Sequence, residues 1–226
     1  MATLGYITAA QAAAYLGWPS LTTPQTTDLS LMIPIAEKLV NNYCGTSFVW
    51  EPNTSKSFSG DNKRILVPGY FISNLYQVDI NDDAGNLVET IYNSTTPQNN
   101  DVNLMPDAPL YGAYRWLERP LISSIGSTAT FTYNFANLTQ STFPIGSKNI
   151  IATADWGFET LPEPVVYAVA LTVQMLFQVR SLNEFIRTES GAGRIVNQSF
   201  YADATQYLPS MARALLSEFI NSKRFS

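Results

Sequence analysis

The pattern of apolar and polar positions divides the chain into two helical ends and a strand-rich middle. Near the N-terminus, Thr8 and Gln11 have the spacing of a capping box, and the alanine-rich run that follows ends before Gly17, which predicts a short helix. A second helix is predicted from about Asp28 to Gly45, because apolar residues recur there at steps of three and four. Pro34 falls inside this pattern and is expected either to kink the helix or to begin its regular part.

Residues 47–156 alternate short β-prone runs with turn clusters, which is typical of an antiparallel β domain of the sandwich or barrel type. The clusters Gly60-Asp61-Asn62 and Asp82 to Asn86 each lie between two such runs and predict hairpins. The stretch 93–109 is rich in Asn and Pro and is expected to be a long loop. The clearest strand predictions are residues 48–50, 65–67, 75–80, 87–92, 128–135 and 149–154.

Helical periodicity returns after Pro162. The run from Val165 to Arg180 is apolar on nearly all sides, which predicts a helix buried at the centre of a bundle or against neighbouring subunits. It contains two glutamines and falls short of the roughly 20 residues that a membrane span needs. A last helix is predicted from about Pro209 to Ser222.

These elements together predict an α+β fold, in which the N- and C-terminal helices pack as one small bundle with a large antiparallel β insertion. Neither helical end carries enough apolar surface to form a domain alone, so the two ends are expected to pack together. The expected parts are an N-terminal helical part at 1–46, a β domain at 47–156 and a C-terminal helical part at 157–226.

Composition narrows the possible chemistry. Among its 226 residues the chain has no histidine and one cysteine, which excludes a Ser–His or Cys–His nucleophile pair, a His-ligated zinc and an intrachain disulfide. The net charge is −5 and the 13 Lys and Arg residues are scattered, which disfavours tight binding to nucleic acid. We therefore expect no catalytic site, no cofactor and no metal.

Three constellations could carry chemistry, and each has a plainer interpretation. Residues 79–85 resemble the start of a calcium loop, but Ala84 and Thr90 stand where an EF-hand needs Gly and Glu, so a solvated hairpin turn is predicted. Residues 191–194 resemble a phosphate loop without its Gly-Lys-Ser/Thr ending, so a connecting loop is predicted. The carboxylates that could form a hydrolase site are Asp155, Glu159 and Glu163, and Glu163 also suits a helix N-terminus.

The tryptophans support an alternative function. A surface of aromatic side chains can stack on sugars, so a carbohydrate- or surface-binding β module is the alternative to a purely structural role. Packing in the core or at an interface is the favoured interpretation of scattered tryptophans. The residues concerned are Trp18, Trp50, Trp116 and Trp156.

One arrangement of motifs is more specific. The opening run Ile7 to Gly17 precedes a helix that ends in the corner Tyr43-Cys44-Gly45-Thr46-Ser47-Phe48. Later, Phe143-Pro144-Ile145-Gly146-Ser147-Lys148-Asn149-Ile150 leads through Asp155-Trp156-Gly157-Phe158 and Leu161-Pro162 into the apolar helix that ends at Arg180. This order of motifs resembles that of the head–tail connector (adaptor, or head completion) proteins of tailed bacteriophages. The resemblance covers both ends and residues 143–180, whereas the middle, about 50–140, does not match residue by residue.

The resemblance implies a non-enzymatic structural virion protein that is made in the host cytoplasm and resides in the neck, at the head–tail interface. Such proteins form a homo-oligomeric ring, commonly a dodecamer, beneath the portal protein, and they offer a platform for a neck or tail completion protein. The ring extends the DNA channel, so DNA passes through it transiently and without sequence specificity, and no membrane is involved. By position, the portal-docking candidates are Phe219, Ile220, Lys223, Arg224 and Phe225. The candidates for downstream or lateral contacts are the β domain and Glu189, Gly191, Gly193 and Arg194.

Overall fold

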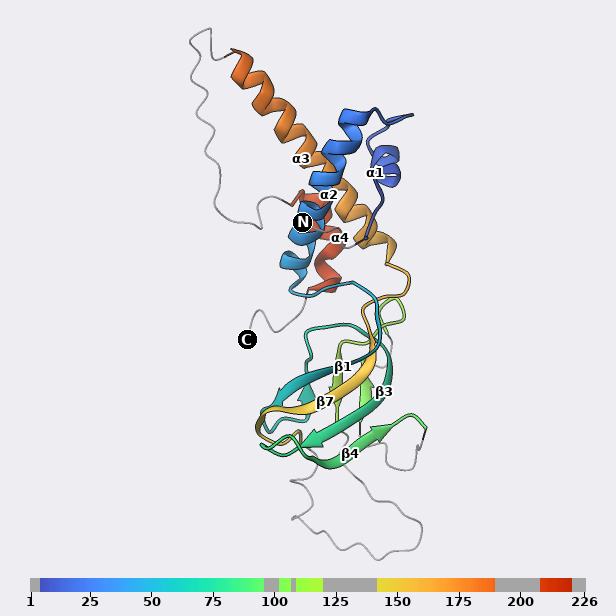
Figure 1. The fold of residues 1–226 in the computed structure, drawn as a ribbon, viewed down its shortest axis with the longest axis vertical. Helices are drawn as coiled ribbons and strands as arrows, with labels where there is room; N and C mark the ends of the chain where they lie inside the picture. The colour runs from blue at the N-terminus through green and yellow to red at the C-terminus, as the bar shows by residue number, and fades with distance from the viewer. Residues whose placement is uncertain (1–4, 96–101, 107–108, 120–141, 190–207, 221–226) are drawn as a thin grey trace, which may run out of the picture. The chain divides into compact units, whose positions relative to one another are not determined.

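The chain has an α+β fold, in which the two terminal segments form helices and the middle of the sequence forms two antiparallel sheets (Figure 1). The computed structural model describes residues 5–95, 102–106, 109–119, 142–189 and 208–220. It divides into a helical unit, residues 1–49 with 160–226, and a β unit, residues 50–159. The sequence predicted these boundaries after residues 46 and 156.

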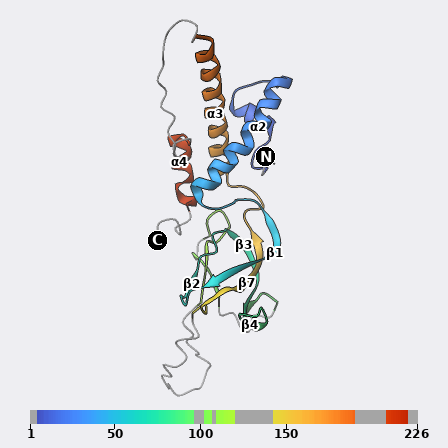
Figure 2. The same ribbon diagram turned by 60° about the vertical axis from the view of Figure 1, so that its left-hand side comes forward.

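The helical unit joins both ends of the chain, as the sequence predicted for the fold. Its central element is α3, which contacts α1, α2 and α4. Figure 2 shows α2 and α4 beside α3. The helices of the unit are α1 (Ala9–Tyr15), α2 (Thr23–Cys44), α3 (Glu163–Glu189), α4 (Ser210–Leu216) and the 3-10 turn η5 (Ser217–Phe219).

Local signals account for the helix ends. The predicted capping box is confirmed at α1, where the backbone N–H of Gln11 donates to the Thr8 hydroxyl at 3.2 Å and the Thr8 N–H donates to the Gln11 side chain at 2.8 Å. Helix α2 begins at Thr23 rather than near Asp28. A second Thr–Gln capping box, formed by Thr22 and Gln25, lies at its start, and the prediction missed it. It ends as predicted at Gly45, whose φ of 69° places it in the left-handed region. Pro34 lies inside α2, which continues on both sides of it.

The predicted apolar helix forms the core of the helical unit. Val165, Val169 and Val173 of α3 are fully buried. Thr172 is also fully buried, and its hydroxyl donates to the carbonyl of Ala168 at 2.7 Å, so its polar group is satisfied inside the helix.

None of the helices in the described ranges has the length and apolar character that a bilayer crossing requires.

The β unit consists of two sheets that share one core. The larger sheet has the order β1 (Glu51–Gly60), β7 (Gly146–Trp156), β3 (Ile72–Asn81) and β4 (Leu87–Asn93). The smaller sheet has the order β2 (Ile65–Leu66), β6 (Trp116–Glu118) and β5 (Asn103–Met105). Buried side chains from both sheets pack together, Ile72, Ile150 and Trp156 from one and Leu66 and Leu117 from the other. The predicted hairpin over residues 82–86 is confirmed as the β3–β4 turn.

Three predictions for the middle of the chain are wrong. Gly60-Asp61-Asn62 does not close a hairpin, because β1 pairs with β7 in one sheet and β2 pairs with β6 in the other. The reason is a close approach: a Cβ at Gly60 would lie 1.8 Å from the carbonyl oxygen of Pro144, so the chain there is fixed by a segment far along the sequence.

The expected loop 93–109 contains a short strand, β5, which pairs with β6. The apolar run at residues 48–50 precedes β1 and forms no strand itself. The expected strand at 128–135 lies outside the described residues.

Candidate interaction surfaces

The portal-docking candidates begin at a residue that belongs to the core. Phe219 of η5 is fully buried, and its ring meets that of Phe48 edge-on, with centroids 5.6 Å apart and an interplanar angle of 70°. The Phe48 ring also meets Tyr6 edge-on at 6.0 Å. In the single chain, Phe219 therefore anchors the end of η5 to the helical unit.

The other docking candidates follow this anchor. Ile220 is half-buried, whereas Lys223, Arg224 and Phe225 lie outside the described residues. Among the candidates for downstream contacts, Glu189 is the last residue of α3. Gly191, Gly193 and Arg194 lie outside the described residues.

A buried polar cluster that sequence reasoning missed joins three segments of the helical unit. Glu37 of α2 is fully buried, and its carboxylate accepts the backbone N–H of Tyr6 at 2.8 Å. The Tyr6 hydroxyl donates to Asn41 at 2.9 Å and accepts the backbone N–H of Phe48 at 2.8 Å. Burial, the largest cause, raises the pKa of Tyr6. The available signal was a glutamate on the apolar face of a predicted helix, four residues after Ile33.

Asp155, the first of the three candidate catalytic carboxylates, ties strands together. It lies on the central strand β7 with 7% of its surface exposed, and its two oxygens accept the backbone N–H of Asn53 on β1 and the hydroxyl of Tyr76 on β3, both at 2.7 Å. The hydrogen bond to Asp155 raises the pKa of Tyr76. Glu159 is exposed, and Glu163 is exposed in the first turn of α3, where it complements the helix dipole. Asp155 thus has a structural role in the sheet.

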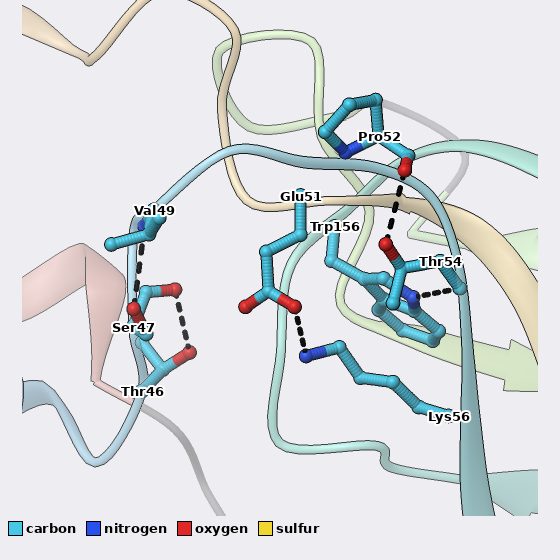
Figure 3. A network of polar contacts seen from close by, with 8 residues as sticks. All are labelled: Thr46, Ser47, Val49, Glu51, Pro52, Thr54, Lys56 and Trp156. Atoms are coloured by element: carbon cyan, nitrogen blue, oxygen red, sulfur yellow. Dashed lines mark hydrogen bonds and ion pairs between the residues drawn. The ribbon is translucent and has the colours of Figure 1, made fainter.

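The tryptophans lie in different environments. Trp156 is fully buried in the β unit, and its indole N–H donates to the carbonyl of Thr54 at 2.7 Å (Figure 3). Beside it, the Lys56 ammonium lies 2.7 Å from the carboxylate of Glu51 and 4.1 Å from the centre of the Tyr70 ring. Trp18 packs edge-on against Phe177 in the helical unit. Trp156 is therefore a core residue and presents no ring face for a sugar.

The acidic loop after β3 is a self-contained turn, as predicted. One carboxylate oxygen of Asp82 accepts the backbone N–H groups of Ala84 at 2.9 Å and Asn86 at 2.8 Å. A hydrogen bond from the Asn86 side chain, the largest cause, together with these backbone bonds holds the pKa of Asp82 below its ordinary value. Within the described ranges, no three His, Cys, Asp or Glu residues gather as a metal ion would need.

Three basic side chains of the β unit, those of Lys56, Lys63 and Arg64, pair with carboxylates of the same unit. Lys63 pairs with Asp61 at 3.0 Å, and Arg64 pairs with Glu118 at 3.0 Å. Arg119 is 4% exposed and donates to the carbonyl of Thr142 at 2.9 Å. The three paired cations add little positive potential to the surface.

The likeness to known proteins lies in the fold. No protein-family model and no curated protein matches the chain. Among solved structures, a chain from the neck of an empty gene transfer agent particle, computed with C6 symmetry, matches with a TM-score of 0.51 and 12% identity, over 98% of this chain and 93% of that one. The chain shares the fold of this neck chain. A chain from the virion of the native gene transfer agent particle also matches, with a TM-score of 0.47 and 14% identity over the same shares of the two chains.

The match to the neck chain extends through the β insertion. The sequence motifs resembled connector proteins only at the two ends and over residues 143–180, whereas the structural match covers 98% of the chain. The predicted resemblance is therefore confirmed as a likeness of fold. This likeness extends to the middle of the chain, about 50–140, where the sequence motifs did not match.

Proposed function

We propose that this chain is a structural protein of the neck of a phage-like virion, where it forms part of a ring and acts without catalysis or cofactor. The observation that carries the proposal is the match to a neck chain across nearly the full length of both proteins. The composition supports a non-enzymatic role, since the chain lacks histidine and its buried carboxylates Glu37 and Asp155 hold structural hydrogen bonds.

The finer proposal is a dodecameric ring that docks beneath the portal protein and extends the DNA channel. A twelvefold ring contains a sixfold axis, so it is compatible with the C6 symmetry applied to the similar neck. The segment after Phe219 is the proposed portal-docking element, because the buried Phe219 ring fixes the point from which it departs. The β unit and the residues from Glu189 to Arg194 are proposed to contact the next neck or tail protein.

The charge distribution supports passage of DNA rather than its capture. Each phosphate that a protein neutralises adds affinity through counterion release. The chain carries a net charge of −5, and three cations of the β unit are paired with its own carboxylates. DNA would therefore slide past this protein with little binding.

Mass measurement tests the proposal. The purified chain is analysed by native mass spectrometry and light scattering, alone and mixed with the portal protein of the same genome. The expected product is a ring of about 300 kDa, twelve times 25.0 kDa, seen face-on by electron microscopy. A chain that stays monomeric and ignores portal particles at every concentration contradicts the proposal.

A further inference from the structure

The chain leaves the helical unit through a short segment that side chains hold in place. Residues 46–49, here called the exit segment, follow α2 and precede the β unit, which begins at Trp50. The exit segment is neither helix nor strand, so its backbone N–H groups need acceptors outside regular secondary structure. The N–H of Val49 donates to the Ser47 hydroxyl at 3.3 Å, within the segment itself (Figure 3).

The buried residue of the exit segment, Phe48, is held from both ends of the sequence. From the N-terminal end, the Tyr6 hydroxyl accepts the backbone N–H of Phe48 at 2.8 Å, and the two rings meet edge-on at 6.0 Å. From the C-terminal end, the Phe219 ring meets the Phe48 ring edge-on at 5.6 Å. All three side chains are buried in the helical unit.

Helix α2 fixes the N-terminal support. The Glu37 carboxylate accepts the backbone N–H of Tyr6 at 2.8 Å, and the Tyr6 hydroxyl donates to the Asn41 side chain at 2.9 Å. Because the hydroxyl proton is directed to Asn41, the oxygen keeps lone pairs for the N–H of Phe48. One hydroxyl group therefore joins α2, the N-terminal segment and the exit segment.

Two groups that hold one residue depend on each other. Tyr6 favours the position of Phe48 in which its ring meets Phe219, and Phe219 favours the position in which the Phe48 N–H meets Tyr6. Residues that share a partner in this way have non-additive effects on stability. The coupling is reciprocal, so whatever fixes Phe219 more firmly also fixes the exit segment more firmly.

We propose that Phe48 couples the C-terminal end of the helical unit to the exit segment, so that docking of the residues after Phe219 orders the segment that leads to the β unit. The docking step rests on the proposed function, whereas the coupling within the chain does not. Docking at one end of the chain would thereby act on the connection to the β unit, which is proposed to contact the next neck or tail protein.

Hydrogen exchange of single amides in the free full-length chain tests the coupling. Tyr6→Phe keeps the ring and removes the hydroxyl, so exchange at Phe48 and Val49 should speed up about tenfold. Phe219→Leu should also speed exchange at the Phe48 amide, although it leaves the hydrogen bond to Tyr6 in place. The double variant should exceed either single variant by less than the product of the two effects, because each support is of little use without the other.

The controls separate coupling from a general loss of stability. Tyr15→Phe, at an exposed position of α1, should leave exchange of the exit segment unchanged. The amide of Val169 in α3 should keep its rate in the Tyr6→Phe chain. An equal acceleration at Val169 would overturn the proposal, as would a double variant within about twofold of the product of the two single effects.

Addition of the portal protein of the same genome tests the docking step. Exchange at Val49 should slow several-fold on docking in the wild type. Phe48→Leu keeps the backbone N–H and removes the ring, so this variant should bind the portal without that slowing. Docking that leaves Val49 unchanged in the wild type overturns the coupling and leaves the neck function standing. A chain that ignores the portal overturns the neck function, and the double variant in the free chain then decides the coupling by itself.

Discussion

The burial of Phe219 gives the sharpest test of the helical unit. Phe219 was a docking candidate by position, but its ring is fully buried and meets Phe48 edge-on at 5.6 Å. Phe219→Ala removes the ring and leaves a cavity beside Phe48, which also loses an aromatic contact. Large-to-small changes at buried phenylalanines cost about 3–5 kcal/mol, and the edge-on pair contributes about 0.5–1.5 kcal/mol of that.

The assay is urea unfolding of the monomeric chain, followed by circular dichroism and by hydrogen exchange of α4 and α2. Exchange reports the helical unit alone, so the result does not depend on whether the two units unfold together. Phe219→Leu keeps part of the volume and should cost less than Phe219→Ala. The matched control is Met211→Ala on the same helix, where the side chain is 57% exposed and the change should stay within about 0.5 kcal/mol.

A Phe219→Ala chain as stable as the wild type would refute this reasoning. It would mean that the ring spends its time outside the core, where it would be available to a portal, as its position in the sequence first indicated. A large loss of stability would instead restrict direct docking to the residues that follow Phe219.

Three further predictions concern other parts of the chain. Gly60→Ala should destabilise the β unit, because its Cβ would lie 1.8 Å from the Pro144 carbonyl oxygen; urea unfolding checks this, and an unchanged midpoint would contradict the close approach. Val169→Asp buries an unpaired charge at a fully buried site of α3 and should cost several kcal/mol or leave the chain insoluble, whereas Val179→Asp, at a position 39% exposed, should be tolerated in the monomer. The lowered pKa of Asp82 means that its turn contributes stability above the ordinary aspartate pKa, about 4, and loses it as the pH falls through the lower folded value. Aspartates titrate between roughly pH 5 and pH 2, so Asp82→Ala should reduce the loss of stability over that range. An unchanged dependence of stability on pH would argue against the hydrogen bonds of the turn.

The sequence by itself determined the features that depend on neighbours a few residues apart. The Thr8–Gln11 box, the glycine end of α2 at Gly45 and the turn around Asp82 each follow from hydrogen bonds within one turn of chain, and all three were predicted correctly. The apolar periodicity of α3 likewise located the central helix, and the mixed order of elements established the α+β class. The motifs also pointed to head–tail connector proteins, and the chain shares its fold with a chain from the neck of a gene transfer agent particle.

Only the tertiary structure decided which segments meet. Strand β1 pairs with β7, joining Phe58 to Ile150, and no local rule favours that partner over the nearby β2, so the predicted Gly60 hairpin was wrong. The same holds for side chains with two possible roles: Asp155 ties β1 to β3, and Phe219 fills a core position of the single chain. Whether an apolar or charged residue is buried, and which groups it contacts, depends on its neighbours in space. Those neighbours come from segments far apart in the sequence.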